Sequence, residues 1–227
     1  MIKNILFDLD DTLFDFKEAE RRSLQKTLLS YGIDHNDETV ALYSRINHSQ
    51  WKLLEKGELD RATLKVRRFA LFSEALGIPF DAKEVSACYE NNLASSHFLI
   101  DGALELLTSL KGRYRLYTVT NGFAHIQKSR LAGAKIESFF DAVFISQEIG
   151  AEKPSPAFFN ACFARIPDFQ KSETVLIGDS ISSDIKGGLQ AGITTVLFCP
   201  NGKPNSEISA HYHIARLADF HNILSIL

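Results

Sequence analysis

Five short apolar runs along the chain predict the strands of a parallel sheet. Each run is nearly continuous in Ile, Leu, Val and Phe, which is typical of strands buried on both faces. A further segment around Tyr212 fits either a surface loop or an edge strand. Helix-like stretches lie between the runs, and this alternation indicates an α/β fold with a doubly wound, mainly parallel sheet. The strand runs are residues 2–9, 114–120, 142–146, 174–178 and 194–198, and the helical stretches are 103–111, 123–132, 156–165, 182–191 and 216–226.

Residues 15–98 break this alternation, because they contain helical patterns and no strand pattern. Glycines follow the first three predicted helices and aspartates open the last three, as expected at helix ends. We therefore predict an all-helical domain at 15–98, inserted into an α/β core domain that consists of residues 1–14 and 99–227. The four predicted helices are 15–31, 37–56, 60–76 and 81–97.

Composition and charge exclude several classes of protein. The 227 residues include 25 Lys+Arg and 28 Asp+Glu, a formal net charge of −3, so we expect neither a nucleic-acid nor a membrane partner. The apolar start of the chain is too short for a signal peptide, and no run reaches the ~18 apolar residues of a membrane span. The three cysteines form no CxxC pair. We expect a cytoplasmic protein that is a monomer or a weak homo-oligomer.

Candidate chemistry begins at the end of the first predicted strand. Asp8 and Asp10 are two residues apart, so on an extended segment they point to the same side. Open α/β sheets bind their ligands at the carboxyl ends of strands, and two carboxylates this close repel unless a proton or a divalent cation lies between them. Alternatively, Asp10, Asp11 and Thr12 only form the turn that closes the strand. The motif alone leaves both interpretations open.

Two later segments suit a phosphate group. Thr120, Asn121 and Gly122 end the second core strand with a hydroxyl and backbone amides that can bind a phosphate oxygen, although a Thr there can also be a helix N-cap. Lys153, next to Pro154, precedes another predicted helix. A lysine held at the sheet edge can neutralise a phosphoryl group, whereas a lone lysine is more often solvated surface.

A second pair of acids follows the fourth predicted strand. Asp179 ends that strand, and Asp184 lies one turn further along the chain. Paired carboxylates at a strand end suit Mg²⁺, a hard cation that takes oxygen ligands. Alternatively, the two aspartates cap the helix predicted at 182–191.

Taken in order, these segments resemble a known family. The DxDxT run at 8–12, Thr120, the Lys-Pro pair at 153–154 and the GDSxxSD run at 178–184 are similar to the motifs of the haloacid dehalogenase-like (HAD) phosphohydrolase superfamily. The resemblance covers nearly the whole chain. It implies a Rossmann-like core and an α-helical cap inserted directly after the first motif. One departure is Asp11, where many members have Gly.

The resemblance also implies a role for each matching residue. Asp8 is expected to be the nucleophile that forms an aspartyl-phosphate, and Asp10 the general acid and then the general base. A Mg²⁺ cofactor is implied at Asp8, the backbone carbonyl of Asp10 and Asp179, with Asp184 in support. The residues implied to hold the phosphoryl group are Thr120, Asn121, Gly122 and Lys153.

The second carboxylate decides between two reactions of this superfamily. Halide displacement at carbon needs the nucleophile but neither an acid for a leaving oxygen nor a metal. Asp10 and the acidic pair at 179 and 184 therefore favour a phosphatase acting on a small phosphomonoester. A phosphomutase would keep the same core, so that alternative stays open.

Aromatic residues give the only indication of the substrate. Phe14, Phe16 and Trp51 could stack on a nucleobase, but aromatic residues more often fill cores. The run from Thr120 to Phe123, together with Asp-Asp-Thr-Leu-Phe at 10–14 and Trp51 in a long helical cap, resembles the 5′-nucleotidase branch, which implies nucleoside monophosphates as substrates. A sugar-phosphate or phosphoglycolate phosphatase, a phosphomutase and a catalytically silent phosphate-binding regulatory module remain as alternatives.

Overall fold

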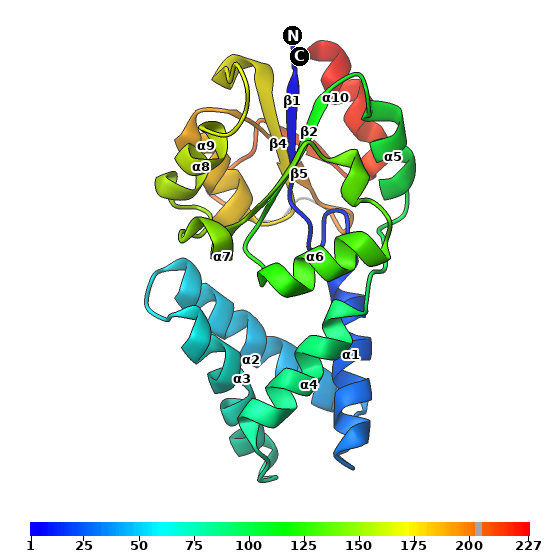
Figure 1. Ribbon diagram of the computed structural model, residues 1–227, viewed down its shortest axis with the longest axis vertical. Coiled ribbons are helices and arrows are strands. Elements are labelled where there is room, and N and C mark those ends of the chain that lie inside the picture. The colour runs from blue at the N-terminus through cyan, green and yellow to red at the C-terminus, as the bar shows by residue number, and fades with distance from the viewer. Residues whose placement is uncertain (203–205) are drawn as a thin grey trace. The chain divides into compact units, whose positions relative to one another are not determined.

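The α/β part of the chain is built on one six-stranded sheet. The computed structural model describes residues 1–202 and 206–227, and all strand pairs in it are parallel, in the order β3-β2-β1-β4-β5-β6. Figure 1 shows β1 between β2 and β4. The prediction of a doubly wound parallel sheet is confirmed, and the segment around Tyr212 is an edge strand. The strands are β1 (Asn4–Phe7), β2 (Arg115–Thr120), β3 (Ala142–Ile145), β4 (Thr174–Gly178), β5 (Thr194–Phe198) and β6 (Tyr212–Ile214).

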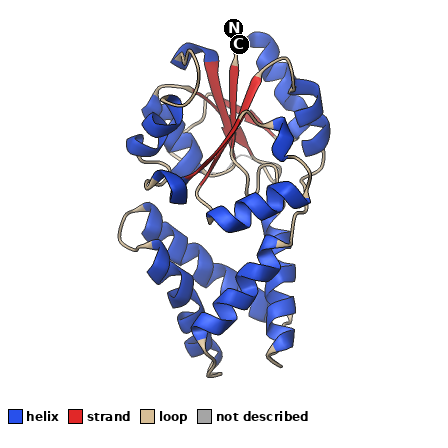
Figure 2. Ribbon diagram, in the orientation of Figure 1, coloured by secondary structure: helices blue, strands red, loops and turns tan. Residues whose placement is uncertain are grey.

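Helices cover both faces of this sheet (Figure 2). Because side chains alternate along a strand, Ile5 and Phe7 of β1 pack on one face, with Phe220 of α10, and Leu6 packs on the other, with Phe158 of α8. Both faces of the central strands are therefore apolar, as the continuous runs predict. The helices are α5 (Ala103–Leu110), α6 (Ala124–Gly133), α7 (Ser146–Ile149), α8 (Pro156–Phe163), α9 (Lys186–Ala191) and α10 (Phe220–Ile226).

Two predicted boundaries are corrected. The predicted strand 2–9 is shorter, since β1 ends at Phe7 and the chain turns directly after it. The predicted helix 182–191 is divided into a π-helical turn, η3 (Ile181–Ile185), and α9. A π-turn widens the helix by one residue and occurs mostly at functional positions.

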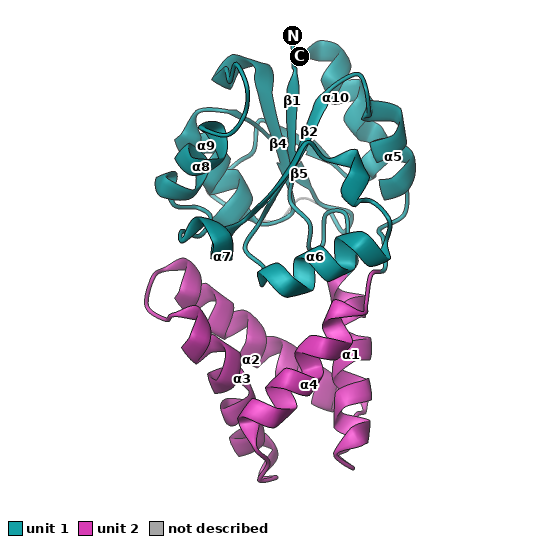
Figure 3. Ribbon diagram, in the orientation of Figure 1, with its two compact units in different colours: residues 1–15, 98–227 teal, residues 16–97 magenta. Residues whose placement is uncertain are grey.

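The chain divides into two compact units, residues 1–15 with 98–227 and residues 16–97 (Figure 3). The second unit contains helices only, and aspartate or asparagine side chains cap three of them at the N-terminus: Asn36, Asp60 and Asp81. In the described parts of the chain, no helix combines the length and apolar character that crossing a membrane requires. The four helices are α1 (Phe16–Ser30), α2 (Asp37–Glu55), α3 (Arg61–Leu76) and α4 (Ala82–Ala94).

Candidate active site

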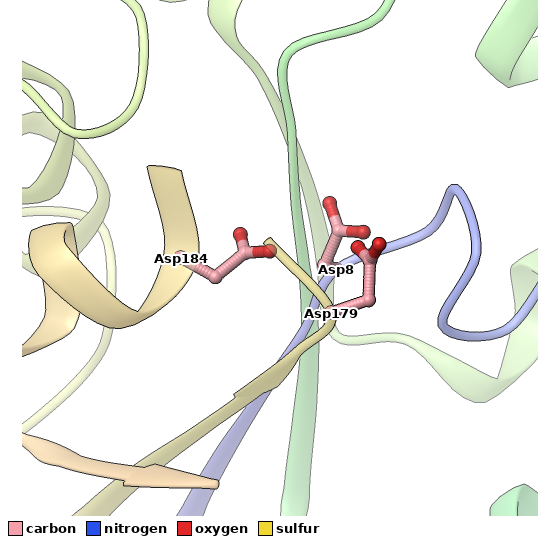
Figure 4. Close-up of side chains that lie close together, drawn as sticks. All are labelled: Asp8, Asp179 and Asp184. Carbon is pink, nitrogen blue, oxygen red and sulfur yellow. The ribbon is translucent and has the colours of Figure 1, made fainter. Parts of the chain in front are cut away.

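Three carboxylates meet at the carboxyl edge of the sheet. Asp8 follows β1 and Asp179 follows the neighbouring strand β4, so parallel pairing brings the two to the same edge. Asp184, on η3, completes the group (Figure 4). One carboxylate oxygen of each residue lies within 4.8 Å of the others. Asp8 and Asp184 are buried, and Asp179 is partly exposed.

Lys153 lies between two of these carboxylates. Its Nζ donates to Asp8 Oδ1 and to Asp184 Oδ1, both at 2.6 Å, and to the carbonyl oxygen of Val119 at 2.7 Å. The side chain is buried, with 1% of the residue exposed, which contradicts the alternative that Lys153 is a solvated surface lysine. Three carboxylates and one ammonium leave two negative charges in excess when all four are ionised.

Burial governs the protonation of this cluster. Desolvation raises the pKa of Asp8 to about 8, and the charges of Asp184 and Asp10 act in the same direction, whereas Lys153 opposes them. Desolvation, with the charges of Asp8 and Asp184, also raises the pKa of Asp179 well above its usual value. Burial alone would lower the pKa of Lys153, but Asp184 and Asp8 outweigh it and raise that pKa.

The donor set of the cluster fits a hard divalent cation. The group offers carboxylate oxygens, and its excess negative charge is of the sign that a cation would neutralise. The carboxylate of Asp10 is not in this group of three. The residues present therefore fit the Mg²⁺ that the sequence predicts.

Contacts within the GDSxxSD run, residues 178–184, fix the position of Asp184. Asp184 Oδ2 accepts a hydrogen bond from the backbone of Ser180 at 3.0 Å, and the side chain of Ser180 caps the turn by accepting from Ser183. A Cβ at position 178 would lie 2.4 Å from Cγ of Asp184. Glycine is thus required at position 178 to let Asp184 approach the strand end. The N-cap of this turn is Ser180, which contradicts the alternative that the aspartates are the caps.

Hydrogen bonds join the segment after β2 to the loop that carries Lys153. Asn121 and Lys153 form two reciprocal hydrogen bonds: Asn121 Nδ2 donates to the carbonyl of Lys153 at 3.0 Å, and the backbone N–H of Lys153 donates to Asn121 Oδ1 at 2.8 Å. Thr120 Oγ1 accepts from the backbone of Gly122 at 3.2 Å. Thr120 precedes the N-cap of α6, Phe123, so it is not the predicted helix cap. The Asn121 side chain therefore holds the backbone of Lys153 in place.

The turn after β1 directs Asp10 away from the cluster. Asp11 has a φ of +59°, in the left-handed region that favours glycine and that Asp tolerates better than most residues. This is the position at which many superfamily members have Gly. The Asp10 carboxylate accepts hydrogen bonds from two buried side chains of α6, Gln127 and Arg130.

Sequence reasoning missed Gln127 and Arg130. The sequence of α6 has little amphipathic pattern, so no sequence signal marked them; only the structure shows that both lie on the buried face of the helix with Ile126 and Leu131. Polar residues that are buried in this way need a specific partner.

The three predicted aromatic residues lie in different surroundings. Phe14 is completely buried in the core of the α/β unit, and the Arg130 guanidinium carbon lies 4.4 Å from its ring centroid. Phe16 begins α1 and Trp51 lies on α2, and both are partly buried. The guanidinium carbon of Arg61 lies 5.9 Å from the Trp51 ring centroid.

Comparisons with known proteins place the chain in a family. The sequence matches the haloacid dehalogenase-like hydrolase family over residues 5–198. HAD-hydrolase YfnB of Bacillus subtilis is 37% identical over 225 residues, 99% of this chain and 96% of the relative. Its crystal structure, described as bound to magnesium, superposes with a TM-score of 0.93 and covers 98% of both chains.

Two further relatives have named substrates. Pyrimidine 5′-nucleotidase PynA of Streptococcus pneumoniae is 36% identical over 204 residues, which cover 89% of this chain and 86% of the relative. Pyrimidine 5′-nucleotidase YjjG of Escherichia coli is 29% identical over 191 residues, which cover 84% of this chain and 83% of the relative.

Proposed function

The chain belongs to the haloacid dehalogenase-like hydrolase family and is therefore an enzyme, and we propose that it is a Mg²⁺-dependent phosphomonoesterase with nucleoside 5′-monophosphates as substrates. The observation that carries this proposal is the buried cluster of Asp8, Asp179 and Asp184 around Lys153. Phosphoryl transfer needs positioning and the neutralisation of spread negative charge, and this cluster offers a fixed nucleophile, a cation and ligands for a metal.

In the first step, a carboxylate oxygen of Asp8 attacks phosphorus. The new bond joins that oxygen to phosphorus, and the bond to the leaving oxygen breaks. Asp10 gives a proton to the leaving oxygen, so the product departs as an alcohol. Lys153 holds Asp8 by a hydrogen bond to Oδ1 and offsets charge on the transferring group.

In the second step, water hydrolyses the aspartyl-phosphate. Asp10, now ionised, takes a proton from the water as its oxygen bonds to phosphorus, and the carboxylate of Asp8 leaves. Inorganic phosphate is released and the starting protonation states return. The two steps need Asp10 in opposite protonation states, which is why a single residue can serve both.

Asp8, the backbone carbonyl of Asp10 and Asp179 would hold Mg²⁺, with Asp184 in support. A bound Mg²⁺ supplies charge neutralisation at the phosphoryl oxygens. The structure of the relative YfnB is described as bound to magnesium, which supports Mg²⁺ as the cofactor.

Two relatives named as pyrimidine 5′-nucleotidases support nucleoside monophosphates as the substrate class. The test is a panel of phosphomonoesters that includes the pyrimidine and purine 5′-nucleotides, sugar phosphates, phosphoglycolate and an aryl phosphate. We expect the highest kcat/KM for a pyrimidine 5′-nucleotide, complete loss with EDTA and recovery with Mg²⁺.

The matched control is Asp8→Asn, which we expect to abolish turnover because an amide is a poor nucleophile. Activity that persists in this variant would come from a contaminating phosphatase or would remove Asp8 from the mechanism. A strong preference for a sugar phosphate or phosphoglycolate would overturn the substrate class. Transfer of the phosphoryl group within a sugar would indicate a mutase, and phosphate binding without any turnover would indicate a regulatory module.

A further inference from the structure

Helix α6 carries two polar side chains in the interior of the α/β unit. Gln127 and Arg130 are three residues apart, so they lie on the same face of the helix. Gln127 is 1% exposed and Arg130 is 0% exposed. Burying a guanidinium away from water is costly unless it is paired and hydrogen-bonded. The hydrogen-bond partners of these two side chains therefore indicate the role of α6 at this site.

Each oxygen of the Asp10 carboxylate has its own donor on α6. Arg130 Nη1 donates to Oδ1, and Gln127 Nε2 donates to Oδ2 at 2.8 Å. The two donors are also joined to each other, since Arg130 Nη1 donates to Gln127 Oε1 at 3.0 Å. This arrangement fixes the plane and the direction of the carboxylate as well as its position.

The same glutamine connects Asp10 to the expected phosphate site. Gln127 Nε2 donates to Thr120 Oγ1 at 2.8 Å, so one amide group joins the carboxylate to the threonine at the end of β2. The Gln127 side chain also lies against residue 122. A Cβ there would be 2.6 Å from Gln127, so this position requires glycine. The guanidinium carbon of Arg130 also lies 4.4 Å from the centroid of the Phe14 ring, within the range of a cation–π contact.

We propose that Gln127 and Arg130 are positioning residues that hold the Asp10 carboxylate in the orientation for proton transfer. Through its hydrogen bonds to Asp10 and Thr120, Gln127 also fixes the position of that carboxylate relative to the threonine. The inference rests on the proposed function, in which Asp10 gives and takes a proton. An aspartate side chain has two free torsions, and a misplacement of about 1 Å in a reacting group can cost about 10²-fold in rate. Both α6 residues contact the Asp10 carboxylate and neither takes part in making or breaking a bond to phosphorus, so their effect passes through Asp10.

A double-mutant cycle tests this inference against a purely structural role. The variants are Arg130→Met, Asp10→Asn and the double variant. The matched control is Lys128→Met on the same helix, where the lysine is exposed and pairs with Glu148. For each protein, kcat and KM are measured with a nucleotide and with an aryl phosphate, and a melting curve records stability.

We expect Arg130→Met to lower kcat on the nucleotide by roughly 10–100-fold, with KM changed by less than about twofold. The loss on the first step with the aryl phosphate should be smaller, because that leaving group needs no acid. In the Asp10→Asn background, Arg130→Met should change the aryl phosphate rate by less than about twofold, because the residue through which it acts has already been removed.

Arg130→Lys provides a rescue. A single nitrogen, Nη1, makes both the contact to Asp10 and the contact to Gln127, so an ammonium can replace it, and we expect this variant to recover most of the lost kcat. A loss from Arg130→Met that is equally large with and without Asp10 would overturn the inference. A loss that follows the melting temperature and is not recovered by lysine would overturn it as well.

A crystal structure of Arg130→Met separates this inference from the proposed function. We expect the Asp10 carboxylate to leave the position in which it accepts from Gln127. If the carboxylate stays there, the positioning role is wrong, whatever the activity. If the wild-type enzyme hydrolyses no phosphomonoester, the proposed function is wrong, and the crystal structure still decides whether Arg130 orients Asp10.

Discussion

Replacing Lys153 by methionine removes the ammonium that lies between Asp8 and Asp184. The substitution keeps a side chain of similar length, so the main change is electrostatic. Two buried carboxylates each lose a 2.6 Å hydrogen bond from a cation, and the carbonyl of Val119 loses a donor. The variant therefore tests how strongly the cluster depends on this charge.

Removing one partner of a buried ion pair costs about 3–5 kcal/mol, because it leaves an uncompensated charge out of water. For a chain of 227 residues, 1 kcal/mol corresponds to roughly 2–4 °C in melting temperature. We therefore expect Lys153→Met to melt about 6–20 °C below the wild type near pH 9 in EDTA, where Asp8 of the wild type is ionised.

The expected loss depends on pH with a definite sign. Burial raises the pKa of Asp8 from 3.8 to about 8, so the ionised carboxylate opposes folding. A group whose pKa is raised in the folded state contributes stability that is complete below the unfolded value and is lost as the pH rises through the folded value. Without Lys153 that pKa rises further, so Asp8 is protonated in both folded proteins below about pH 8, and the deficit of the variant should grow as the pH rises above about 8.

The assay is thermal unfolding in EDTA at about pH 6 and about pH 9, on either side of the raised pKa of Asp8, repeated with Mg²⁺. The matched control is Lys128→Met, which removes an exposed ion pair with Glu148 and should cost at most about 1 kcal/mol at either pH. Mg²⁺ should recover part of the loss at the higher pH, where it replaces some of the missing charge. A loss below about 1 kcal/mol, or a loss that is equal at both pH values, would show that the ammonium of Lys153 does not stabilise the ionised form of Asp8.

Three further substitutions test other parts of the site. Asp179→Asn should raise the Mg²⁺ concentration for half activity, because a hard cation loses an anionic ligand, and an unchanged requirement in a Mg²⁺ titration would place the metal elsewhere. Gly178→Ala should displace Asp184 and destabilise the protein by about 1–3 kcal/mol, which a melting curve and the same titration check; neither changing would contradict the close approach. Trp51→Ala should lower kcat/KM for nucleotides relative to an aryl phosphate. Because Trp51 is only partly buried, the loss of stability should be smaller than the roughly 3–5 kcal/mol that truncating a fully buried aromatic residue costs. Equal losses on every substrate would instead indicate a packing role.

The sheet could be predicted from the sequence because its central strands are buried on both faces. Continuous apolar runs leave few alternatives for such strands. The edge strand β6 has three residues and lies at the end of the sheet, so its pattern could not separate a strand from a loop. The exact end of β1 also depends on the turn at Asp11, which periodicity does not show.

The acidic cluster could be predicted because the fold itself brings its members together. Asp8 and Asp179 follow adjacent parallel strands, and such strands end at the same edge of a sheet. The partners of Asp10 could not be predicted in this way. Gln127 and Arg130 are 117 and 120 residues away along the chain, and their contact depends on how α6 packs. Polar residues on a helix are usually solvated, so only their burial distinguishes them.

The most direct test of the account is whether Asp8 becomes phosphorylated during turnover. Asp10→Asn can neither give nor take a proton, so with an aryl phosphate its first step should survive while hydrolysis of the intermediate becomes slow, by about 10²–10⁴-fold. We expect a rapid burst of phenolate and, in acid-quenched samples, mass spectrometry that finds one phosphoryl group on the peptide containing Asp8. Asp8→Asn should give neither signal. Turnover without a burst, or a phosphoryl group on any other residue, would contradict the proposal that this enzyme acts through an aspartyl-phosphate on Asp8.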